Sequence, residues 1–299
     1  MIGPFLDFKE NPVLRAGSGF DSRGAFNPAV VKEGDTYFML YRAESLVYDL
    51  TGTIGLARSQ DGVHFTKHLD PVVVPDKGFD KFGCEDPRLV KIGDTYYLTY
   101  VGNCGRYKTG NICLATSKDV IHWEKHGSIL NPQKEWDHGQ VKAGAILPQR
   151  IKGKYVMYLM GEKEPWKTAI GLAYSDGLLR WYEPLDQPVL LPREGFFDSQ
   201  GVEPGPPPLL TEEGIWLIYC GWAEDCVYKV GAVLFSKDDP SKVLQRSEEP
   251  IFAAKDWGKT FGGIANHVVA EGLVREENRW LLYYGAADRA CCLAIWEEK

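Results

Sequence analysis

The stretch Phe82-Gly-Cys-Glu-Asp-Pro-Arg-Leu-Val-Lys-Ile-Gly-Asp-Thr-Tyr-Tyr-Leu-Thr-Tyr-Val101 predicts a β-hairpin whose first strand begins with charge. The apolar run Leu89–Val90 precedes the turn signal Gly93–Asp94, and the residues after the turn are aromatic and β-branched, as is typical of strands. Two carboxylates and a guanidinium stand at the mouth of this hairpin: Glu85, Asp86 and Arg88. Charge at the start of an otherwise apolar strand is unusual for a protein core and indicates a functional site.

The same hairpin pattern occurs five times along the chain. The second strand of each copy contains a tyrosine, and these tyrosines are separated by 59, 58, 61 and 65 residues. A nearly constant period with two strands in each copy indicates radial repetition. The tyrosines are Tyr41, Tyr100, Tyr158, Tyr219 and Tyr284, in copies that span residues 27–41, 85–100, 142–158, 203–219 and 271–284.

A second pair of strands follows each of the first hairpins. In the first repeat, residues 54–65 lead to residues 71–74, and similar pairs recur in the next repeats. Four antiparallel strands in each of five units predict an all-β fold, the five-bladed β-propeller. The last unit lacks its outer strand, which we expect the N-terminal segment 5–13 to supply. Because a propeller closes only as a whole, we expect a single domain over residues 1–299.

Composition excludes several classes of function. The formal net charge is −7 and Lys and Arg do not cluster, so no nucleic-acid partner is expected. No apolar run approaches the roughly 20 residues that a membrane span needs, so no membrane partner is expected. The N-terminus has no basic and apolar leader, and the seven cysteines show neither disulfide nor metal spacing. We therefore expect a cytoplasmic protein with reduced thiols.

The inner strand of every propeller blade lines the central channel, so the starts of the five inner strands converge on one cavity. A merely packed channel would favour small or apolar residues there, whereas this chain has polar ones: Asn27, Glu85, Asp86, Lys142, Glu203, Asn266 and His267. Three more polar residues follow hairpin strands and are expected to reach the same rim: Arg42, Glu162 and Asp288. The predicted pocket is rich in carboxylates and contains a few cations and amides.

Convergent carboxylates with Asn and Arg nearby are typical of a glycosidase. One acid protonates the leaving oxygen, a second group activates the nucleophile, and amides hold hydroxyl groups. Signatures of serine hydrolases and P-loop proteins are absent, and the six histidines do not have zinc-ligand spacing. We therefore expect a small oligosaccharide as substrate, and neither a metal nor a cofactor. His64 and His122 recur in equivalent outer-strand motifs and are interpreted as structural.

Six motifs give the chain a resemblance to a known family. They are Asn27-Pro-Ala, Tyr41-Arg-Ala, Ala57-Arg-Ser-Gln-Asp-Gly, Glu85-Asp-Pro-Arg, Gly205-Pro-Pro-Pro and Tyr283-Tyr-Gly-Ala-Ala-Asp288. At these positions, and over essentially its whole length, the chain resembles glycoside hydrolase family 130, the β-mannoside phosphorylases and β-mannosidases. The fold of that family is a five-bladed propeller, in agreement with the repeats.

The resemblance implies roles for individual residues. Asp86 matches the catalytic acid of the family, which is thought to protonate the glycosidic oxygen through the 3-hydroxyl of the sugar. Asn266 matches a residue of the +1 subsite, and Tyr228 matches a tyrosine near the phosphate of the phosphorylases. Three further residues match positions that hold the mannose in subsite −1: Asn27, Arg42 and Asp288.

The chain departs from the phosphorylases of this family at three positions that the resemblance connects with phosphate. Gly201 stands where they carry a lysine, Cys220 where they carry a histidine, and Glu162 where they carry an arginine. Burying a phosphate requires cations or several hydrogen-bond donors. The loss of three basic groups therefore favours water as the acceptor, and hence an inverting, β-mannosidase-like hydrolase.

Such a hydrolase needs a carboxylate base roughly 6.5–9.5 Å from the acid. Glu203 is the first candidate, ahead of Glu271 and Glu162. One alternative is a phosphorylase that releases α-mannose 1-phosphate, to which Lys142 and Tyr228 would contribute. Another is a sugar-binding propeller without catalysis. The linkage of the substrate stays open, and both a monomer and a homo-oligomer are compatible with the sequence.

The polar residues of the predicted pocket fall into a catalytic group and a substrate-binding group. Arg88 is expected to tie blades together, and the loop residues Trp136, Trp166 and Trp222 are expected either to stack on sugar rings or to pack. The catalytic candidates are Asp86, Glu203, Glu271 and Glu162. The substrate-binding candidates are Asn27, Arg42, Arg58, Glu85, Lys142, Tyr228, Asn266, His267 and Asp288.

Overall fold

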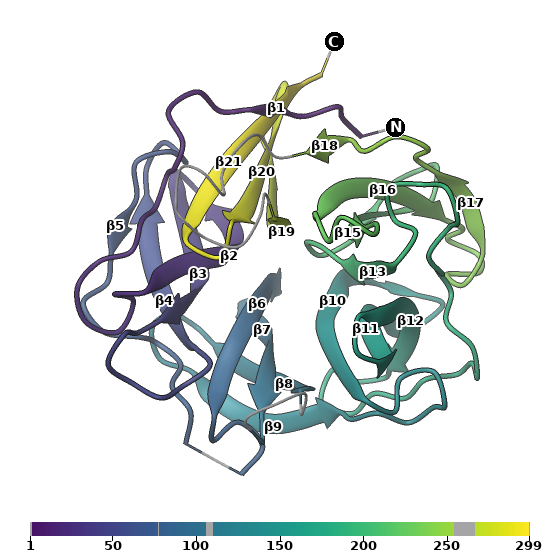
Figure 1. The fold of residues 1–299 in the computed structure, drawn as a ribbon, viewed down its shortest axis with the longest axis horizontal. Coiled ribbons are helices and arrows are strands. Elements are labelled where there is room, and N and C mark those ends of the chain that lie inside the picture. The colour runs from purple at the N-terminus through teal and green to yellow at the C-terminus, as the bar shows by residue number, and fades with distance from the viewer. Residues whose placement is uncertain (1, 77, 106–109, 254–266, 299) are drawn as a thin grey trace.

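Five antiparallel sheets stand around a central axis, and the chain passes through them in order (Figure 1). The computed structural model describes residues 2–76, 78–105, 110–253 and 267–298. Each sheet begins with a long hairpin whose first strand lies nearest the axis, as the repeats predict. The predicted five-bladed β-propeller is therefore confirmed.

The first two blades are four-stranded meanders in which each strand pairs with the next. Blade one consists of β2 (Gly24–Glu33), β3 (Thr36–Glu44), β4 (Thr53–Ser59) and β5 (Thr66–Lys67). Blade two consists of β6 (Gly83–Ile92), β7 (Thr95–Asn103), β8 (Gly110–Ser117) and β9 (Glu124–Leu130).

Blades three and four are less regular. Blade three has β10 (Gln140–Ile151), β11 (Lys154–Glu164) and β12 (Lys167–Ser175). Its outer strand is reduced to two isolated bridges, Ile170 with Leu190 and Tyr174 with Tyr182, and Pro188 and Pro192 beside Leu190 have no N–H to donate. Blade four has β13 (Gly201–Pro204), β14 (Leu209–Leu210), β15 (Ile215–Trp222), β16 (Lys229–Phe235), β17 (Val243–Arg246) and β18 (Phe252–Ala253).

The N-terminal segment completes the last blade. Blade five consists of β19 (Val268–Arg275), β20 (Arg279–Ala286), β21 (Ala290–Glu297) and β1 (Leu6–Asp7). Strand β1 pairs antiparallel with β21, with Leu6 opposite Ile295, so the first and last strands of the chain lie side by side (Figure 1). The predicted outer strand from residues 5–13 is thus confirmed. This closure covers an edge of β21 that would otherwise be unpaired.

A buried aspartate precedes the inner strand in four blades. In three of them it accepts a hydrogen bond from a buried tyrosine: Tyr41 to Asp21, Tyr100 to Asp80 and Tyr219 to Asp198. The same three aspartates form ion pairs with a cation of an outer strand: Lys67, Lys125 and Arg246. Each of these three blades therefore pairs its buried aspartate with a partly buried cation of its own outer strand, which compensates the loss of hydration.

Blade three breaks this rule. Its aspartate is Asp137, and Glu183 occupies the position equivalent to Lys125. Each of these two residues follows a tryptophan, Trp181 or Trp123, by two positions. Burial raises the pKa of Glu183 to about 9, and its hydrogen bond with Asp137 acts in the same direction. At neutral pH Glu183 therefore keeps its proton, and a neutral carboxyl group stands beside Asp137 in place of the cation of blades one, two and four.

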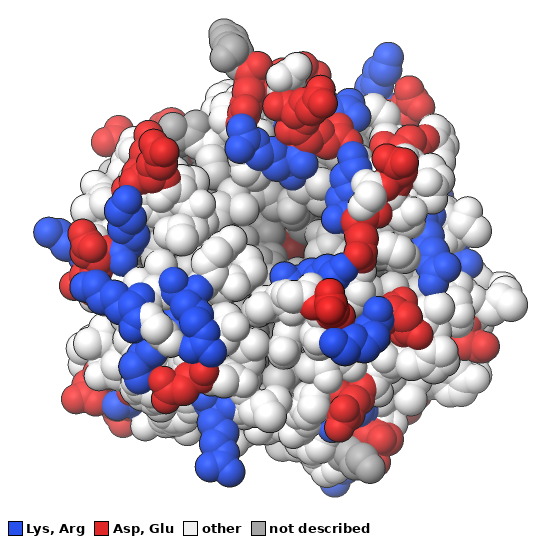
Figure 2. Space-filling model, turned by 180° about the vertical axis from the view of Figure 1, so that it is seen from behind, with Lys and Arg blue, Asp and Glu red and all other residues white. Residues whose placement is uncertain are grey.

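The surface carries charges of both signs. Figure 2 shows one broad face, on which Lys and Arg side chains alternate with Asp and Glu around a central hollow. The described residues contain no helix that is long and apolar enough to cross a bilayer.

Candidate active site

Three inner strands are bent at the same level, and this bend aims polar side chains at the axis. The pairing register shifts between Phe26 and Pro28, and equivalent shifts interrupt β6 and β10. A residue with positive φ lies at each shift: Asn27 (51°), Asp86 (48°) and Ala143 (53°). Residues other than glycine rarely adopt a positive φ. Register shifts of this kind are β-bulges, which are common beside functional sites, as strained backbone is. Two of the three strained residues are candidates from the sequence.

The bent strands surround a pocket of about 430 Å³. All five blades contribute to its lining, so the convergence expected from the repeats is present. The lining residues are Asn27, Arg42, Asp86, Gln140, Lys142, Met160, Glu162, Trp166, Thr168, Glu203, Trp222, Tyr228, His267, Val269 and Asp288. A volume of this size suits a small organic ligand.

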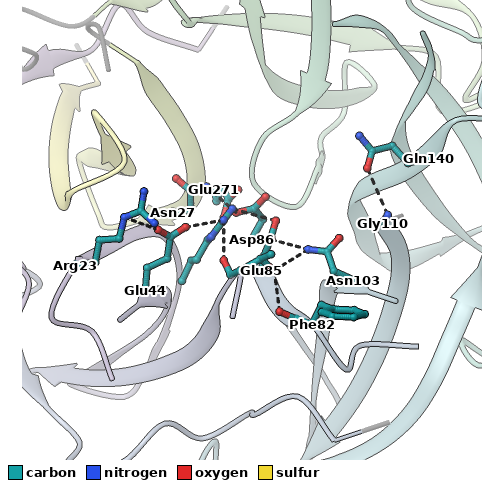
Figure 3. A network of polar contacts seen from close by, with 12 residues as sticks. Arg23, Asn27, Glu44, Phe82, Glu85, Asp86, Asn103, Gly110, Gln140 and Glu271 are labelled. Atoms are coloured by element: carbon teal, nitrogen blue, oxygen red, sulfur yellow. Dashed lines mark hydrogen bonds and ion pairs between the residues drawn. The ribbon is translucent and has the colours of Figure 1, made fainter. Parts of the chain in front are cut away.

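Asp86 is held by groups of blade one. Asn27 Nδ2 donates to Asp86 Oδ1 at 2.8 Å (Figure 3). Arg42 Nη1 donates to the same oxygen at 3.2 Å. Burial acts to raise the pKa of Asp86, but Arg42, then Lys142, outweigh it, so the pKa lies below its usual range. Asp86 is therefore ionised in the free pocket.

Glu85 lies behind this contact and does not line the pocket. Its carboxylate accepts a hydrogen bond from Arg42 Nη1 at 3.1 Å. It accepts a second one from Asn103 Nδ2 at 2.5 Å (Figure 3). Arg42 Nη2 also donates to Glu44 Oε1 at 2.7 Å. Glu85 was predicted to bind substrate; the structure places it outside the lining, in contact with Arg42, which does line the pocket.

Arg88 and Glu271 form a buried pair beneath the pocket, and this corrects the prediction of Glu271 as a base. Arg88 Nη1 lies 2.9 Å from Glu271 Oε1, and both side chains are almost completely buried. Arg88 also donates to the carbonyl oxygens of Pro204 at 2.8 Å and Gly205 at 3.1 Å, which ties blade two to blade four. The register of β19 also shifts, between Ala270 and Gly272, so Glu271 stands at a position like those of Asn27 and Asp86, but it does not line the pocket.

Glu203 differs from the other carboxylates because it stands alone. Among the described residues, no side chain or backbone group forms a hydrogen bond or an ion pair with its carboxyl group. Burial raises the pKa of Glu203 to about 7; Arg88 and Lys142 oppose this, whereas the carboxylates of Asp86 and Asp288 act in the same direction. Glu203 therefore exchanges its proton near neutral pH.

Glu162 is engaged by its own blade. One carboxylate oxygen, Oε1, accepts a hydrogen bond from the backbone N–H of Trp166 at 2.6 Å. The other, Oε2, accepts one from the side-chain amide of Gln140, whose own oxygen faces the N–H of Gly110 (Figure 3). Glu162 lines the pocket, but both of its oxygens already hold neighbouring groups.

The structure separates two more candidates from the site. Arg58 is exposed on β4, opposite Phe38 in the register of β3, whereas Arg42 at the pocket lies opposite Ile54. Four residues of strand thus separate Arg58 from the level of Arg42, and the structure does not bring it to the pocket. Asn266 lies outside the described residues.

Several lining residues escaped the sequence analysis. Gln140 stands two residues before Lys142 on the same inner strand, so its polar side chain at a strand start was a visible signal. Met160, Thr168 and Val269 are apolar or small and carry no chemical signature. Within the described chain, no group of three or more His, Cys, Asp or Glu side chains is arranged to hold a metal ion.

The fold and the pocket define a carbohydrate-active propeller. A family model for glycoside hydrolase family 130, described as beta-1,4-mannooligosaccharide phosphorylase, matches residues 8–299. A 1,2-β-oligomannan phosphorylase of Thermoanaerobacter sp. (strain X514) is 34% identical, over 97% of this chain and 96% of that protein. The chain therefore belongs to glycoside hydrolase family 130.

Two solved structures are similar throughout. One bears the description "The GH130 family of mannoside phosphorylases contains glycoside hydrolases that target beta-1,2 mannosidic linkages in Candida mannan". It has a TM-score of 0.87 and 29% identity, and the match covers 99% of this chain and 94% of that one. The other is a β-1,2-mannobiose phosphorylase from Listeria innocua in complex with β-1,2-mannobiose. It has a TM-score of 0.85 and 25% identity, with coverage of 98% and 96%.

Proposed function

We propose that this protein is an inverting enzyme that cleaves short β-mannosides, with β-1,2-linked mannosides as the first candidates. Membership of family 130 supports the substrate class, and the names of the similar proteins refer to oligomannan, mannobiose and β-1,2 linkages. One observation carries the proposal. Two carboxyl groups with opposite pKa shifts, Asp86 and Glu203, line the same sugar-sized pocket.

Asp86 is the acid in this proposal. Its carboxylate is ionised in the free pocket because Asn27 and Arg42 donate to it. A sugar hydroxyl that binds Asp86 competes with the Arg42 contact of 3.2 Å, which is longer than the contact of 2.7 Å between Arg42 and Glu44. Asp86 then takes up a proton from solvent water as the sugar binds. It gives this proton to the 3-hydroxyl, whose own proton passes to the glycosidic oxygen as the glycosidic bond breaks, the route that the family resemblance implies.

Glu203 is the base. A general base is most effective when its pKa lies near the working pH, and the pKa of Glu203 is raised to about 7 by burial. Its carboxyl group has no partner among the described residues that would compete with a water molecule. Glu162, in contrast, is committed to Trp166 and Gln140, and Glu271 to Arg88.

The mannosyl group can be transferred either to water, in hydrolysis, or to phosphate, in phosphorolysis. The names of the curated relatives favour phosphate, and thus the phosphorylase alternative, over the hydrolase that the sequence analysis favoured. The charges of the pocket support water. The ring of Trp222 covers Gly201, and Glu162 presents a carboxylate beside Trp166, where the resemblance implied a lysine and an arginine. On this ground we take water as the acceptor. Phosphorolysis is the second candidate, because Lys142 and His267 also line the pocket.

A product screen tests the proposal. The protein is incubated with β-1,2-, β-1,3- and β-1,4-mannobiose, each in phosphate-free buffer and in buffer with phosphate. We expect mannose to be released from at least one linkage at the same rate in both buffers. Asp86→Asn is the control for contaminating activity. A failure to cleave any β-mannobiose in either buffer would refute the proposed function, whereas strict dependence on phosphate would move it to the second candidate.

A further inference from the structure

Four aromatic side chains form a continuous wall on one side of the pocket. We call Trp166, Trp222, Tyr228 and His267 the aromatic wall. The rings of Trp222 and Tyr228 stack at 4.4 Å with an interplanar angle of 17°, and Tyr228 lies 5.1 Å from the ring of His267. Trp166 meets Trp222 edge to face, at 6.5 Å and 86°. Blades three, four and five each supply part of this wall.

Trp166 differs from its neighbours in exposure. Trp222 is 1% exposed and its ring is enclosed, whereas Trp166 is 56% exposed although its side chain lines the pocket. Leaving a large aromatic surface in water is unfavourable by roughly 25 cal/mol for each Å² of apolar area. An exposed indole at the mouth of a sugar-sized pocket therefore offers a surface that a ligand can cover.

The backbone of Trp166 is held in a strained conformation. Its φ is 68°, which is an outlier for a bulky side chain. The residue lies in the turn between β11 and β12, where its N–H donates to Glu162 Oε1 at 2.6 Å. Glu162 is fixed in turn by the amide of Gln140. Strain of this kind persists only where surrounding contacts determine it, and it is common at ligand clamps.

We propose that Trp166 is a stacking platform for the second mannosyl unit of the substrate, and that Glu162 is the positioning residue that holds this platform. The proposal rests on the proposed function, since it takes a mannoside as the ligand. A pyranose ring has an apolar C–H face that packs flat against an indole, while its hydroxyl groups stay in water. The polar groups near Asp86 hold the first sugar, and the exposed ring at the rim receives the next one.

A binding experiment separates the platform from catalysis. The background is Asp86→Asn, which binds substrate without turnover, and the ligands are methyl β-mannoside, with one ring, and β-1,2-mannotriose. Calorimetry gives Kd for each. We expect Trp166→Ala to weaken mannotriose binding about tenfold and to leave methyl β-mannoside within about twofold, while Trp166→Phe restores most of the affinity. Tyr182→Ala, which removes an exposed ring at the other end of blade three, is the matched control and leaves both Kd values unchanged.

Glu162 gives an independent readout. Glu162→Ala removes the acceptor for the Trp166 N–H and is expected to reproduce the selective loss of mannotriose affinity. Glu162→Gln keeps an oxygen acceptor and is expected to retain most of the affinity. If Glu162 were a catalytic base, both variants would lower kcat for every substrate without changing the Kd of mannotriose in the Asp86→Asn background. Melting temperatures of all variants show whether the fold is kept.

The outcomes distinguish the platform from the proposed function. If the wild-type protein cleaves no β-mannobiose in the product screen, the proposed function fails, and the platform with it. If both ligands bind but Trp166→Ala leaves mannotriose affinity unchanged, the platform is refuted while the proposed function stands. If Trp166→Ala weakens both ligands equally, the indole belongs to the site of the first sugar, and the assignment to the second mannosyl unit is overturned.

Discussion

The indole of Trp222 covers Gly201 so closely that a Cβ at Gly201 would lie 2.0 Å from Cζ2 of the ring. No real Cβ contact is that short, so the ring and a side chain at Gly201 exclude each other. The stacked pair of Trp222 and Tyr228 extends from this point along the pocket. An aromatic ring thus fills the place where the family resemblance expects the lysine of the phosphorylases.

Gly201→Ala is predicted to destabilise the protein. The new methyl group must displace Trp222 or the strand, and overpacking of this kind costs typically ~1–3 kcal/mol. Chemical denaturation measures the change in the free energy of unfolding. Gly201→Lys alone is predicted to create no phosphate dependence, because the lysine cannot reach past the ring. A stable Gly201→Lys protein whose activity requires phosphate would contradict this account of the pocket.

Asp86→Asn is predicted to lower kcat by ~10²–10⁴-fold, because general acid catalysis contributes about this much. The amide keeps the shape of the carboxyl group, but its oxygen carries no transferable proton. Circular dichroism and thermal denaturation should show an intact fold. A variant that keeps more than about a tenth of the wild-type kcat would exclude Asp86 as the acid.

Glu203 is predicted to control the acidic limb of the pH profile. A base must be ionised, and the pKa of Glu203 is raised to about 7 by burial, so kcat/KM should fall as the pH drops below about 7. Glu203→Gln should abolish this limb together with most of the activity. A value of kcat/KM that stays constant between about pH 5 and 8 would exclude Glu203 as the base. This is roughly the range in which a histidine, or a glutamate with a raised pKa, titrates.

The same shift predicts an effect on stability. The pKa of Glu203 is about 7 in the folded protein against 4.5 as its ordinary value, so folding favours the protonated form. The stability that this proton contributes is complete below about pH 4.5 and is lost as the pH rises to about 7. Glu203→Gln should therefore stabilise the protein by about 2–3 kcal/mol at pH 8 and by little at pH 4.5. Equal melting-temperature changes at both pH values would show that Glu203 is not desolvated.

Much of the site follows from the repeats, and the failures have physical causes. The five strand starts could be located because each copy ends at a tyrosine, so Asp86, Lys142 and Glu203 were found. Glu271 was aligned with these positions and does stand at the register shift of β19, but it pairs with the buried Arg88 and does not line the pocket. Arg58 matched a family motif, but in the register of β3 and β4 it lies four residues along the strand from Ile54, the residue opposite Arg42.

Pairwise partners could not be predicted from the sequence. The choice between a free base and a structural carboxylate depends on contacts between residues far apart in the chain. Glu162 is held by Gln140 and by the Trp166 backbone, whereas Glu203 has no such partner among the described residues. The charge of a side chain is visible in the sequence, but its hydrogen-bond partners are fixed only by the closed ring of blades.

Glu183→Lys is predicted to stabilise the protein. The new lysine would pair with Asp137 as Lys125 pairs with Asp80 in blade two. The change would also remove the carboxyl group of Glu183, whose pKa is raised to about 9 by burial. Because the folded pKa lies above the ordinary value of 4.5, the wild type loses stability as the pH rises from about 4.5 to about 9, and the variant should not. Melting temperatures over this range measure the difference.

Lys125→Glu in blade two is the matched reverse change. It places a carboxylate against Asp80 and breaks a buried ion pair, which costs typically ~3–5 kcal/mol. If Glu183→Lys destabilised the protein as much as Lys125→Glu, a lysine at position 183 would not pair with Asp137 as Lys125 pairs with Asp80. The two positions would then not be equivalent.

The acceptor is tested most directly by following the products of β-1,2-mannobiose cleavage with proton and phosphorus NMR, in buffer that contains phosphate. Water and phosphate then compete within one sample for the same bound substrate. The account predicts that mannose appears first as the α-anomer, that no phosphorus signal of a sugar phosphate appears, and that removing phosphate leaves the rate unchanged. Accumulation of α-mannose 1-phosphate, with no turnover in phosphate-free buffer, would contradict it.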